Sequence, residues 1–398
     1  MTGAPALYTP EFVRACVLLF MGAMSLSLFL LFPLYVKALG GSEATIGLLL
    51  GVGTAASVAV RPVVGVVLDR IGRRPVLVWC GIANVLSWIP FVFLTGVGPA
   101  LYVWTTFHDV VWGALFAAYF TYAADLAPPL RRAEAIAMFG IAGMSANGLA
   151  PILGERVIEV GGWNAYFGLA IAFGLAAVAL SLRVPDGVAR SPHEAPPSLR
   201  DVVDLARLPR LATVMAATAL LGIAINAAYM FVAPFTRVVG LARAGPFFAA
   251  YSGTSVVIRL FGRRTLDVLG SHRVSAPGFV VYGAALVGLA VLPAAAGGGL
   301  ATLVLVLCGM GCGFGHGSLF PVLNALAISR APAGRQGAVV GLHTAAIDVG
   351  AVLGMPLCGI IAEAFGYPAM FGVMALACVA GLVLMAKDAR AAERGWGR

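Results

Sequence analysis

Runs of about 20 apolar residues recur along almost the whole length of this chain. A helix of that length crosses the hydrocarbon core of a bilayer, which is about 30 Å thick. Lipid offers the backbone no hydrogen-bond partners, so spanning segments of this kind are helical. The sequence therefore predicts an all-α integral membrane protein with twelve transmembrane helices, at 14–38, 44–66, 75–96, 101–126, 134–159, 163–183, 208–237, 244–268, 275–295, 299–327, 336–364 and 367–387.

The composition excludes a soluble protein. Hydrophobic residues make up 61% of the 398 residues and charged residues 11%, and the mean hydropathy is +0.96. Soluble proteins have roughly 45–50% apolar and about 25% charged residues. The first apolar run is too long for a signal peptide and has no basic leader, so we expect it to remain as the first span.

The basic residues separate by side of the membrane. With the N-terminus inside, 22 of the 26 Lys and Arg residues fall on the cytoplasmic side, leaving Lys37, Arg156, Arg237 and Arg243 outside. This bias follows the positive-inside rule and predicts that both termini are cytoplasmic. The net charge of +9 then reflects topology, which argues against nucleic-acid binding.

The spans form two halves. A Pro-rich polar stretch at 184–207 is predicted to be a cytoplasmic linker between six-helix bundles at 1–183 and 208–398. The loops after the second and eighth spans read "RPVVGVVLDRIGRRPV" and "RLFGRRTLDVLGSHRV". Identical residues correspond at one constant offset: Arg61 with Arg259, Asp69 with Asp267, Gly72 with Gly270, and Val76 with Val274. Two parallel six-helix repeats are a transporter construction, with the substrate site near the midplane.

The first of these loops resembles the signature loop of the major facilitator superfamily, Gly-x-x-x-Asp-Arg-x-Gly-Arg-Arg. The match consists of Gly65, Asp69, Arg70, Gly72, Arg73 and Arg74, with a degraded copy at Asp267 and Gly270. The resemblance extends over nearly the whole chain through the twelve-span layout and the central linker. It implies a secondary transporter that works by alternating access.

The resemblance also implies that the loop is a gate latch. In that family the aspartate lies against the start of the eleventh helix, and the loop arginines pair across the two halves. A carboxylate is favoured at a helix N-terminus. We expect Gly65 to let the second helix approach its neighbour closely, and we assign Arg61 and Arg259 a structural or gating role, with snorkelling to the interface as the alternative.

A second motif bears on direction. The fifth span contains "GLAPILGE", which resembles the Gly-Pro-x-x-Gly-Gly motif of exporters in this superfamily. Gly148, Pro151 and Gly154 carry the resemblance, whereas Ala150 and Glu155 depart from it. The resemblance favours export, and ordinary helix packing around a proline kink is the alternative.

Ionisable residues inside spans are costly and therefore are functional candidates. The candidates for proton coupling are Asp109, Asp348, His316 and Glu155. Each has a structural alternative, which for Asp109 is an ion pair with Arg156. In the family arrangement the first, fourth, seventh and tenth helices line the cavity, so Asp109 would meet a proton or a cationic substrate.

Neutral polar and aromatic residues on those helices are candidates for substrate contact, with core packing as the alternative. They are Met21, Ser25, Phe29, Trp112, Phe116, Asn226, Tyr229, Phe320 and Asn324. The cavity helices contain no pair of arginines that would indicate a phosphate or carboxylate substrate. The sequence has no acidic cluster that would indicate a metal site and no P-loop that would indicate ATP binding. We therefore expect neither a metal nor a cofactor.

The sequence thus favours a proton-coupled exporter, an antiporter, of a small amphipathic organic compound. We expect a monomer in the cell membrane, which in a bacterium is the cytoplasmic membrane. The alternative within transport is an importer or facilitator of a small metabolite such as a sugar. A lipid-modifying membrane enzyme is a remote alternative, because no cluster of acids, His and Ser stands at one interface.

Overall fold

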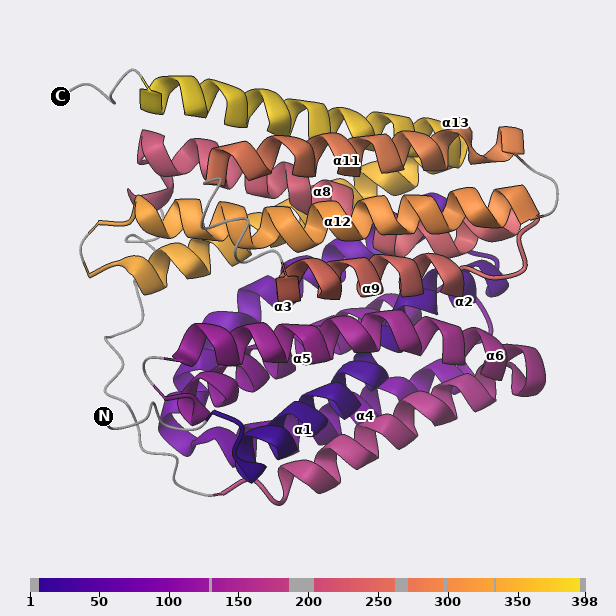
Figure 1. The fold of residues 1–398 in the computed structure, drawn as a ribbon. Helices are drawn as coiled ribbons and strands as arrows, with labels where there is room; N and C mark the ends of the chain where they lie inside the picture. The colour runs from indigo at the N-terminus through magenta and orange to yellow at the C-terminus, as the bar shows by residue number, and fades with distance from the viewer. Residues whose placement is uncertain are drawn as a thin grey trace. The chain divides into compact units, whose positions relative to one another are not determined.

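A computed structural model describes residues 7–128, 131–185, 204–261, 271–295, 299–332 and 334–393. Every regular element among these residues is a helix (Figure 1). The α-helices, with short 3-10 helices η, are α1 (Pro10–Ser27), η1 (Leu28–Leu31), α2 (Phe32–Ala38), α3 (Glu43–Ile71), α4 (Arg73–Trp88), η2 (Ile89–Phe93), α5 (Pro99–Leu126), α6 (Arg132–Ser181), α8 (Pro209–Val238), α9 (Gly245–Phe261), α11 (Ser271–Val291), η4 (Leu292–Ala295), α12 (Gly299–Ser329) and α13 (Gln336–Glu393). The predicted linker lies mostly outside the described residues.

Eight helical stretches in the described part are long and apolar enough to cross a membrane, judged by length and composition. They include the continuous stretch Pro10–Ala38, in which η1 joins α1 to α2. The fourth and eighth predicted spans, which lie in α5 and α9, are not among the eight. An all-helical, multi-pass membrane fold is thereby confirmed.

The two longest helices turn back on themselves at a glycine. α6 has 50 residues and α13 has 58, far more than the roughly 20 that cross a bilayer. Gly162 (φ 68°) and Gly366 (φ 84°) have non-helical backbone angles inside them, and two helices join at each. Positive φ is open to glycine at little cost, so each join stands where the sequence supplies one. Both joins fall between two predicted spans.

The chain divides into two compact units. The first, hereafter the N-terminal unit, comprises Met1–Gly40 and Ala56–Pro196. The second, the C-terminal unit, comprises Gly41–Ala55 and Pro197–Arg398. The boundary falls inside α3, whose first turns group with the C-terminal unit.

The N-terminal unit has an aromatic core around the break in its first helix. Trp88, Phe91 and Phe167 pack there beneath η1 and α2, all nearly inaccessible. Two tyrosine hydroxyls donate to backbone carbonyls, Tyr35 to Phe91 O at 2.5 Å and Tyr166 to Leu28 O. These bonds satisfy polar groups that would otherwise be buried without partners.

The C-terminal unit is held together by close helix contacts at glycines. α8 packs on α13, and α12 packs on α9 and α11. A Cβ added at Gly222 of α8 would collide with the Ile347 carbonyl, and one at Gly350 of α13 with the Ala219 carbonyl. Small residues allow such approach between membrane helices, where dispersion and packing drive association.

Replacing Gly350 by alanine tests this packing. The new methyl group would meet the backbone of α8, so we expect the C-terminal unit to lose about 1–3 kcal/mol, the usual cost of overpacking. The midpoint of thermal unfolding in detergent should fall by several degrees. Gly341→Ala, on the same helix, is the matched control because an added Cβ there meets no atom within 4 Å. An equal drop in both variants would show that helix contact is not the cause.

Candidate functional site

The loop between α3 and α4 is organised by Gly72, whose φ of +90° is accessible mainly to glycine. The next residue, Arg73, is 7% exposed. Its Nε donates to Asp125 Oδ2 at 2.6 Å, and Nη1 donates to Leu68 O at 2.8 Å. This buried ion pair fastens the start of α4 to the end of α5 inside the N-terminal unit.

Two observations bear on the expectations for this loop. Arg73 pairs within its own unit, whereas the resemblance implied pairing across the halves. A Cβ added at Gly65 would meet no described atom within 4 Å. The side chain of Asp69, and both Asp267 and Gly270, lie outside the described residues.

One face of α5 presents the sharpest charge in the N-terminal unit. Asp109 is half-buried, and its Oδ2 is inaccessible and has no hydrogen-bond partner among the described residues. Trp112 and Phe116 follow on the same face with stacked rings, 5.4 Å between centroids. Arg61 of α3 lies over the Phe116 ring at 5.9 Å. A carboxyl group left unpaired beside aromatic rings is suited to exchange a proton or to bind a cation.

The expected alternative partner of Asp109 is engaged elsewhere. Arg156, with its side chain 65% exposed, forms an ion pair with Glu159 at 3.1 Å, one turn further along α6. Its neighbour Glu155 is buried in α6, at 1% exposure. The structure therefore gives no support to a structural Asp109–Arg156 pair.

His108, beside Asp109 on α5, faces the core of the N-terminal unit. It is fully buried, and its ring stacks on Phe29 at 4.4 Å. Ser87 Oγ donates to Asn84 O at 2.7 Å, so it accepts from His108 Nδ1, 2.8 Å away. His108 is thus a buried core histidine whose hydrogen bond joins α5 to α4.

Two predicted substrate contacts on the first helix are buried inside the N-terminal unit. Ser25 is fully buried, accepts a hydrogen bond from Asn84 Nδ2 at 2.9 Å and donates to Ala170 O at 2.8 Å. Phe29 is 5% exposed and lies in the aromatic core. Ser25 bonds to residues of α4 and α6, and the Phe29 ring packs on Trp88 and His108, so both side chains join the first helix to its neighbours. Met21 is half-buried.

The exporter-like segment lies in α6 and packs against the break in the first helix. Pro151 is buried within the helix. A Cβ added at Gly154 would come within 3.0 Å of Leu28, Leu31 and Tyr166. Gly148, three residues before Pro151, is buried. The small residue at Gly154 is therefore needed for packing in the structure.

In the C-terminal unit a hydrogen-bonded cluster surrounds His316 of α12. Its Nδ1 lies 2.9 Å from the hydroxyl of Tyr251 on α9, which lies 3.3 Å from the hydroxyl of Tyr282 on α11. Tyr282 donates to Ala224 O of α8 at 3.4 Å. Gly313 and Gly317 on α12 meet the backbone of α9, so the helices lie close enough for this contact. The cluster links four helices.

Arg259 of α9 lies at the same α9–α12 interface, next to Phe320, which follows His316 by four residues. Its Cζ is 5.8 Å from the centroid of the Phe320 ring, and its Nε is inaccessible and has no hydrogen-bond partner among the described residues. Asn324, one turn after Phe320, has an inaccessible Oδ1 that likewise has no partner there. All three side chains are half-buried.

The remaining predicted residues of this unit differ in exposure. Tyr229 of α8 is 7% exposed and packs on Tyr251 with 4.6 Å between ring centroids. Asn226, also on α8, is half-buried and donates from Nδ2 to Gly222 O at 2.8 Å. Asp348 of α13 is half-buried, one turn after Thr344. Tyr229 therefore belongs to the packed core, and Asn226 and Asp348 are more accessible.

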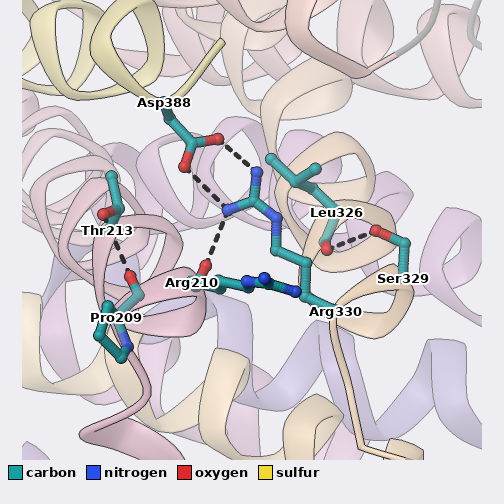
Figure 2. A network of polar contacts seen from close by, with 7 residues as sticks. All are labelled: Pro209, Arg210, Thr213, Leu326, Ser329, Arg330 and Asp388. Carbon is teal, nitrogen blue, oxygen red and sulfur yellow. Dashed lines mark hydrogen bonds and ion pairs between the residues drawn. The ribbon is translucent and has the colours of Figure 1, made fainter. Parts of the chain in front are cut away.

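A second buried ion pair closes one end of the C-terminal unit (Figure 2). Arg330, at the end of α12, donates to both carboxylate oxygens of Asp388 near the end of α13, at 2.9 and 2.5 Å. It also donates to Arg210 O at the start of α8, at 2.7 Å. Asp388 is 3% exposed. One arginine thereby fastens three helix ends.

The partners in these contacts are residues that the sequence did not predict for the site: Asp125, Asp388, Tyr251, Tyr282 and Asn84. The acids at the ends of the fourth and twelfth spans are signals that could have been used, because each stands near the level of the arginine-rich loops. No group of three or more His, Cys, Asp and Glu residues in the described ranges could hold a metal ion.

Comparison with known proteins gives one family. The family model described as Major Facilitator Superfamily matches residues 15–344 and 311–395. An uncharacterised MFS-type transporter of Pseudomonas aeruginosa (strain UCBPP-PA14) is 31% identical over 147 residues, which are 36% of this chain and 34% of the relative. A second, from Burkholderia mallei (strain SAVP1), is 36% identical over 72 residues, 18% of each chain. The first match spans about a third of the relative's length.

Solved structures share the fold. A mutant of the nucleoside transporter NupG superposes with a TM-score of 0.82 at 14% identity, covering 95% of this chain and 99% of that one. A mutant of the peptide transporter POT gives 0.78 at 16% identity, covering 95% and 94%. The human organic anion transporter MFSD10 gives 0.68 at 18% identity, covering 95% and 100%. At these identities the likeness shows the fold alone. The similar proteins are transporters, not enzymes.

Removing one partner of the Arg73–Asp125 pair tests its structural role. Both side chains are nearly inaccessible, at 7% and 6% exposure. We expect Arg73→Gln to cost about 3–5 kcal/mol, because the remaining carboxylate loses its counter-charge in a buried site. The readout is the thermal unfolding midpoint, with Arg73→Gln/Asp125→Asn closing a double-mutant cycle. Arg14→Gln breaks the exposed Arg14–Glu11 pair, at 57% and 45% exposure, and should leave the midpoint unchanged. Additive effects of the two mutations would contradict direct pairing.

Proposed function

The chain belongs to the major facilitator superfamily, and from that premise we propose that it is a secondary transporter working by alternating access. Its helices are apolar enough to make it a multi-pass membrane protein. We further propose twelve spans, formed by counting α5, α9 and both arms of α6 and α13. The same proposal places both termini in the cytoplasm and the protein in the cell membrane as a monomer, the cytoplasmic membrane if the source is bacterial.

We infer that transport is coupled to protons through Asp109. This inference rests on one observation: a carboxylate oxygen of Asp109 is inaccessible and unpartnered among the described residues of a membrane helix. Other acids in the interior of the units, Asp125 and Asp388, are held in ion pairs. An acid without a fixed counter-charge can change its charge during the cycle without first breaking a bond.

We infer that the direction of transport is export and that the substrate is a small amphipathic organic compound. The segment around Pro151 and Gly154 supports export only by its resemblance to the exporter motif, since Gly154 also has a packing role. An importer or facilitator of a small metabolite such as a sugar is the second candidate. The two differ in coupling, because a facilitator needs no intramembrane acid. The loop after α3 remains our proposed gate.

Inverted membrane vesicles test the function. Export from the cell corresponds to uptake into such vesicles, and an antiporter should accumulate its substrate only when a proton gradient, acidic inside, is imposed. A panel of amphipathic cations, anions and neutral compounds should be assayed with and without the gradient. Equal uptake in both conditions would identify a facilitator, and uptake only into right-side-out vesicles an importer.

Asp109→Asn should abolish gradient-driven accumulation, because the amide cannot exchange the proton. We expect at least a tenfold loss of uptake with little change in the thermal unfolding midpoint, since the buried carboxylate oxygen has no hydrogen-bond partner among the described residues. Glu159→Gln is the matched control, as its carboxylate lies in a partly exposed pair with Arg156. Wild-type accumulation by Asp109→Asn would refute proton coupling at this residue.

Asp348→Asn separates coupling from binding. In our proposal Asp348 contributes to proton coupling without touching the substrate, so the variant should bind substrate with unchanged Kd. Its gradient-driven uptake should nevertheless fall. Loss of equilibrium binding in this variant would instead place Asp348 at the substrate.

A further inference from the structure

Arg259 differs from Arg73 and Arg330 in what compensates its charge. Arg73 and Arg330 each contact a carboxylate at 2.6 Å or less. Arg259 forms no ion pair with a described residue, and its Nε is inaccessible without a hydrogen-bond partner. Its only described compensation is the Phe320 ring, 5.8 Å away. A cation on a membrane helix is costly and is usually paired, so one without a partner among the described residues is a candidate to bind a charged ligand.

The surroundings of Arg259 supply further binding groups. His316, Phe320 and Asn324 are spaced by four residues and so share one face of α12. Asn324 has an inaccessible, unpartnered amide oxygen, and the two ends of an Asn amide are interchangeable by a flip of the side chain. An Asn at this place can therefore offer N–H donors as readily as an acceptor. Arg259, Phe320 and Asn324 are half-buried, so none is sealed inside the unit.

The chemistry of these groups selects a ligand class. A guanidinium held over an aromatic ring keeps its N–H edge available for the oxygens of an anion, which it binds through charge-assisted hydrogen bonds. A single arginine offers one positive charge, which matches a monoanion such as a carboxylate or sulfonate. The nearby Phe320 ring, which is half-buried, suits the apolar part of an organic molecule rather than a hydrated inorganic ion.

The N-terminal unit contains a similar arrangement, which provides a comparison for Arg259. Arg61 lies over Phe116 at 5.9 Å, in the position that the sequence repeat matches to Arg259. The arginine-on-phenylalanine contact is therefore built twice. Arg61 has further interactions of its own, and its α5 face carries Asp109, an acid, where the α12 face carries His316 and Asn324.

We propose that Arg259, assisted by Asn324 and supported by the Phe320 ring, binds the anionic group of the transported substrate, which is an amphipathic organic monoanion. The proposal rests on the transporter function proposed above and names its substrate class. It replaces the gating role expected for Arg259 with direct contact to substrate.

The test is equilibrium binding to the purified full chain in lipid nanodiscs, without any gradient. The probes are 2-naphthoate and octanoate, each with its neutral amide as the matched ligand. Wild type should bind at least one carboxylate tenfold or more tighter than the corresponding amide. Arg259→Gln should remove this preference, and Arg259→Lys should retain part of it because the charge remains. Asn324→Ala should weaken carboxylate binding several-fold and leave amide binding unchanged.

Each outcome decides the proposal. No preference for either carboxylate in wild type, or an unchanged preference in correctly folded Arg259→Gln, overturns it. Should Arg259→Gln fail to fold, Arg259→Lys and Asn324→Ala carry the test, and unchanged preferences in both overturn it. Arg61→Gln serves as the repeat-matched comparison and should keep the carboxylate preference, whereas an equal loss there would show a general charge effect and overturn the assignment.

Transport assays keep this inference separate from the proposed function. Gradient-driven uptake of cations or neutral compounds alone would sustain proton-coupled transport and refute the anion subsite. Arg259-dependent binding of carboxylates without any gradient-driven uptake would sustain the subsite and refute the coupling.

Discussion

The structure depends on one constraint: a charge or polar group removed from water must find a partner inside the protein. The backbone meets this constraint by forming helices throughout the described chain. Side chains meet it through pairs such as Arg73–Asp125 and Arg330–Asp388, which also fasten helix ends within each unit. The groups that do not meet it are therefore informative. Asp109 in the N-terminal unit and Arg259 in the C-terminal unit are the two on which our functional proposals rest.

The sequence predicted the helical elements well because their causes are local. Apolar length marks the helices, and the joins within α6 and α13 fall at Gly162 and Gly366, where a positive φ requires little more than a glycine in the right place. The signature loop around Asp69 also predicted the family, which the match over most of the chain confirms. Apolar length was less useful for α5, which carries polar residues such as His108 and Asp109, and for α9, of which only 17 residues are described.

The partners of the candidate site could not be predicted, because they are set by packing between distant segments. Arg73 and Asp125 are 52 residues apart, and Arg330 and Asp388 are 58 apart. Ser25 was expected to face substrate, and its bonds to Asn84 and Ala170 depend on which face of the first helix meets α4 and α6. A single sequence gives the rotation of a uniformly apolar helix only weakly, since the hydrophobic pattern lacks one polar side.

The two proposed sites together have an energetic consequence. If a proton enters the cell through Asp109 while a monoanion bound at Arg259 leaves it, both movements carry positive charge inward. One elementary charge crossing 100 mV is worth about 2.3 kcal/mol, so a one-for-one exchange gains about 4.6 kcal/mol from the membrane potential alone. A neutral substrate would gain half of that and a monocation none. The bound anion also neutralises Arg259, so the cost of an unpaired cation in the membrane falls on the empty carrier rather than on the loaded one. An arginine without a fixed counter-charge is in this way suited to the export of anions, because the cargo itself supplies the missing partner.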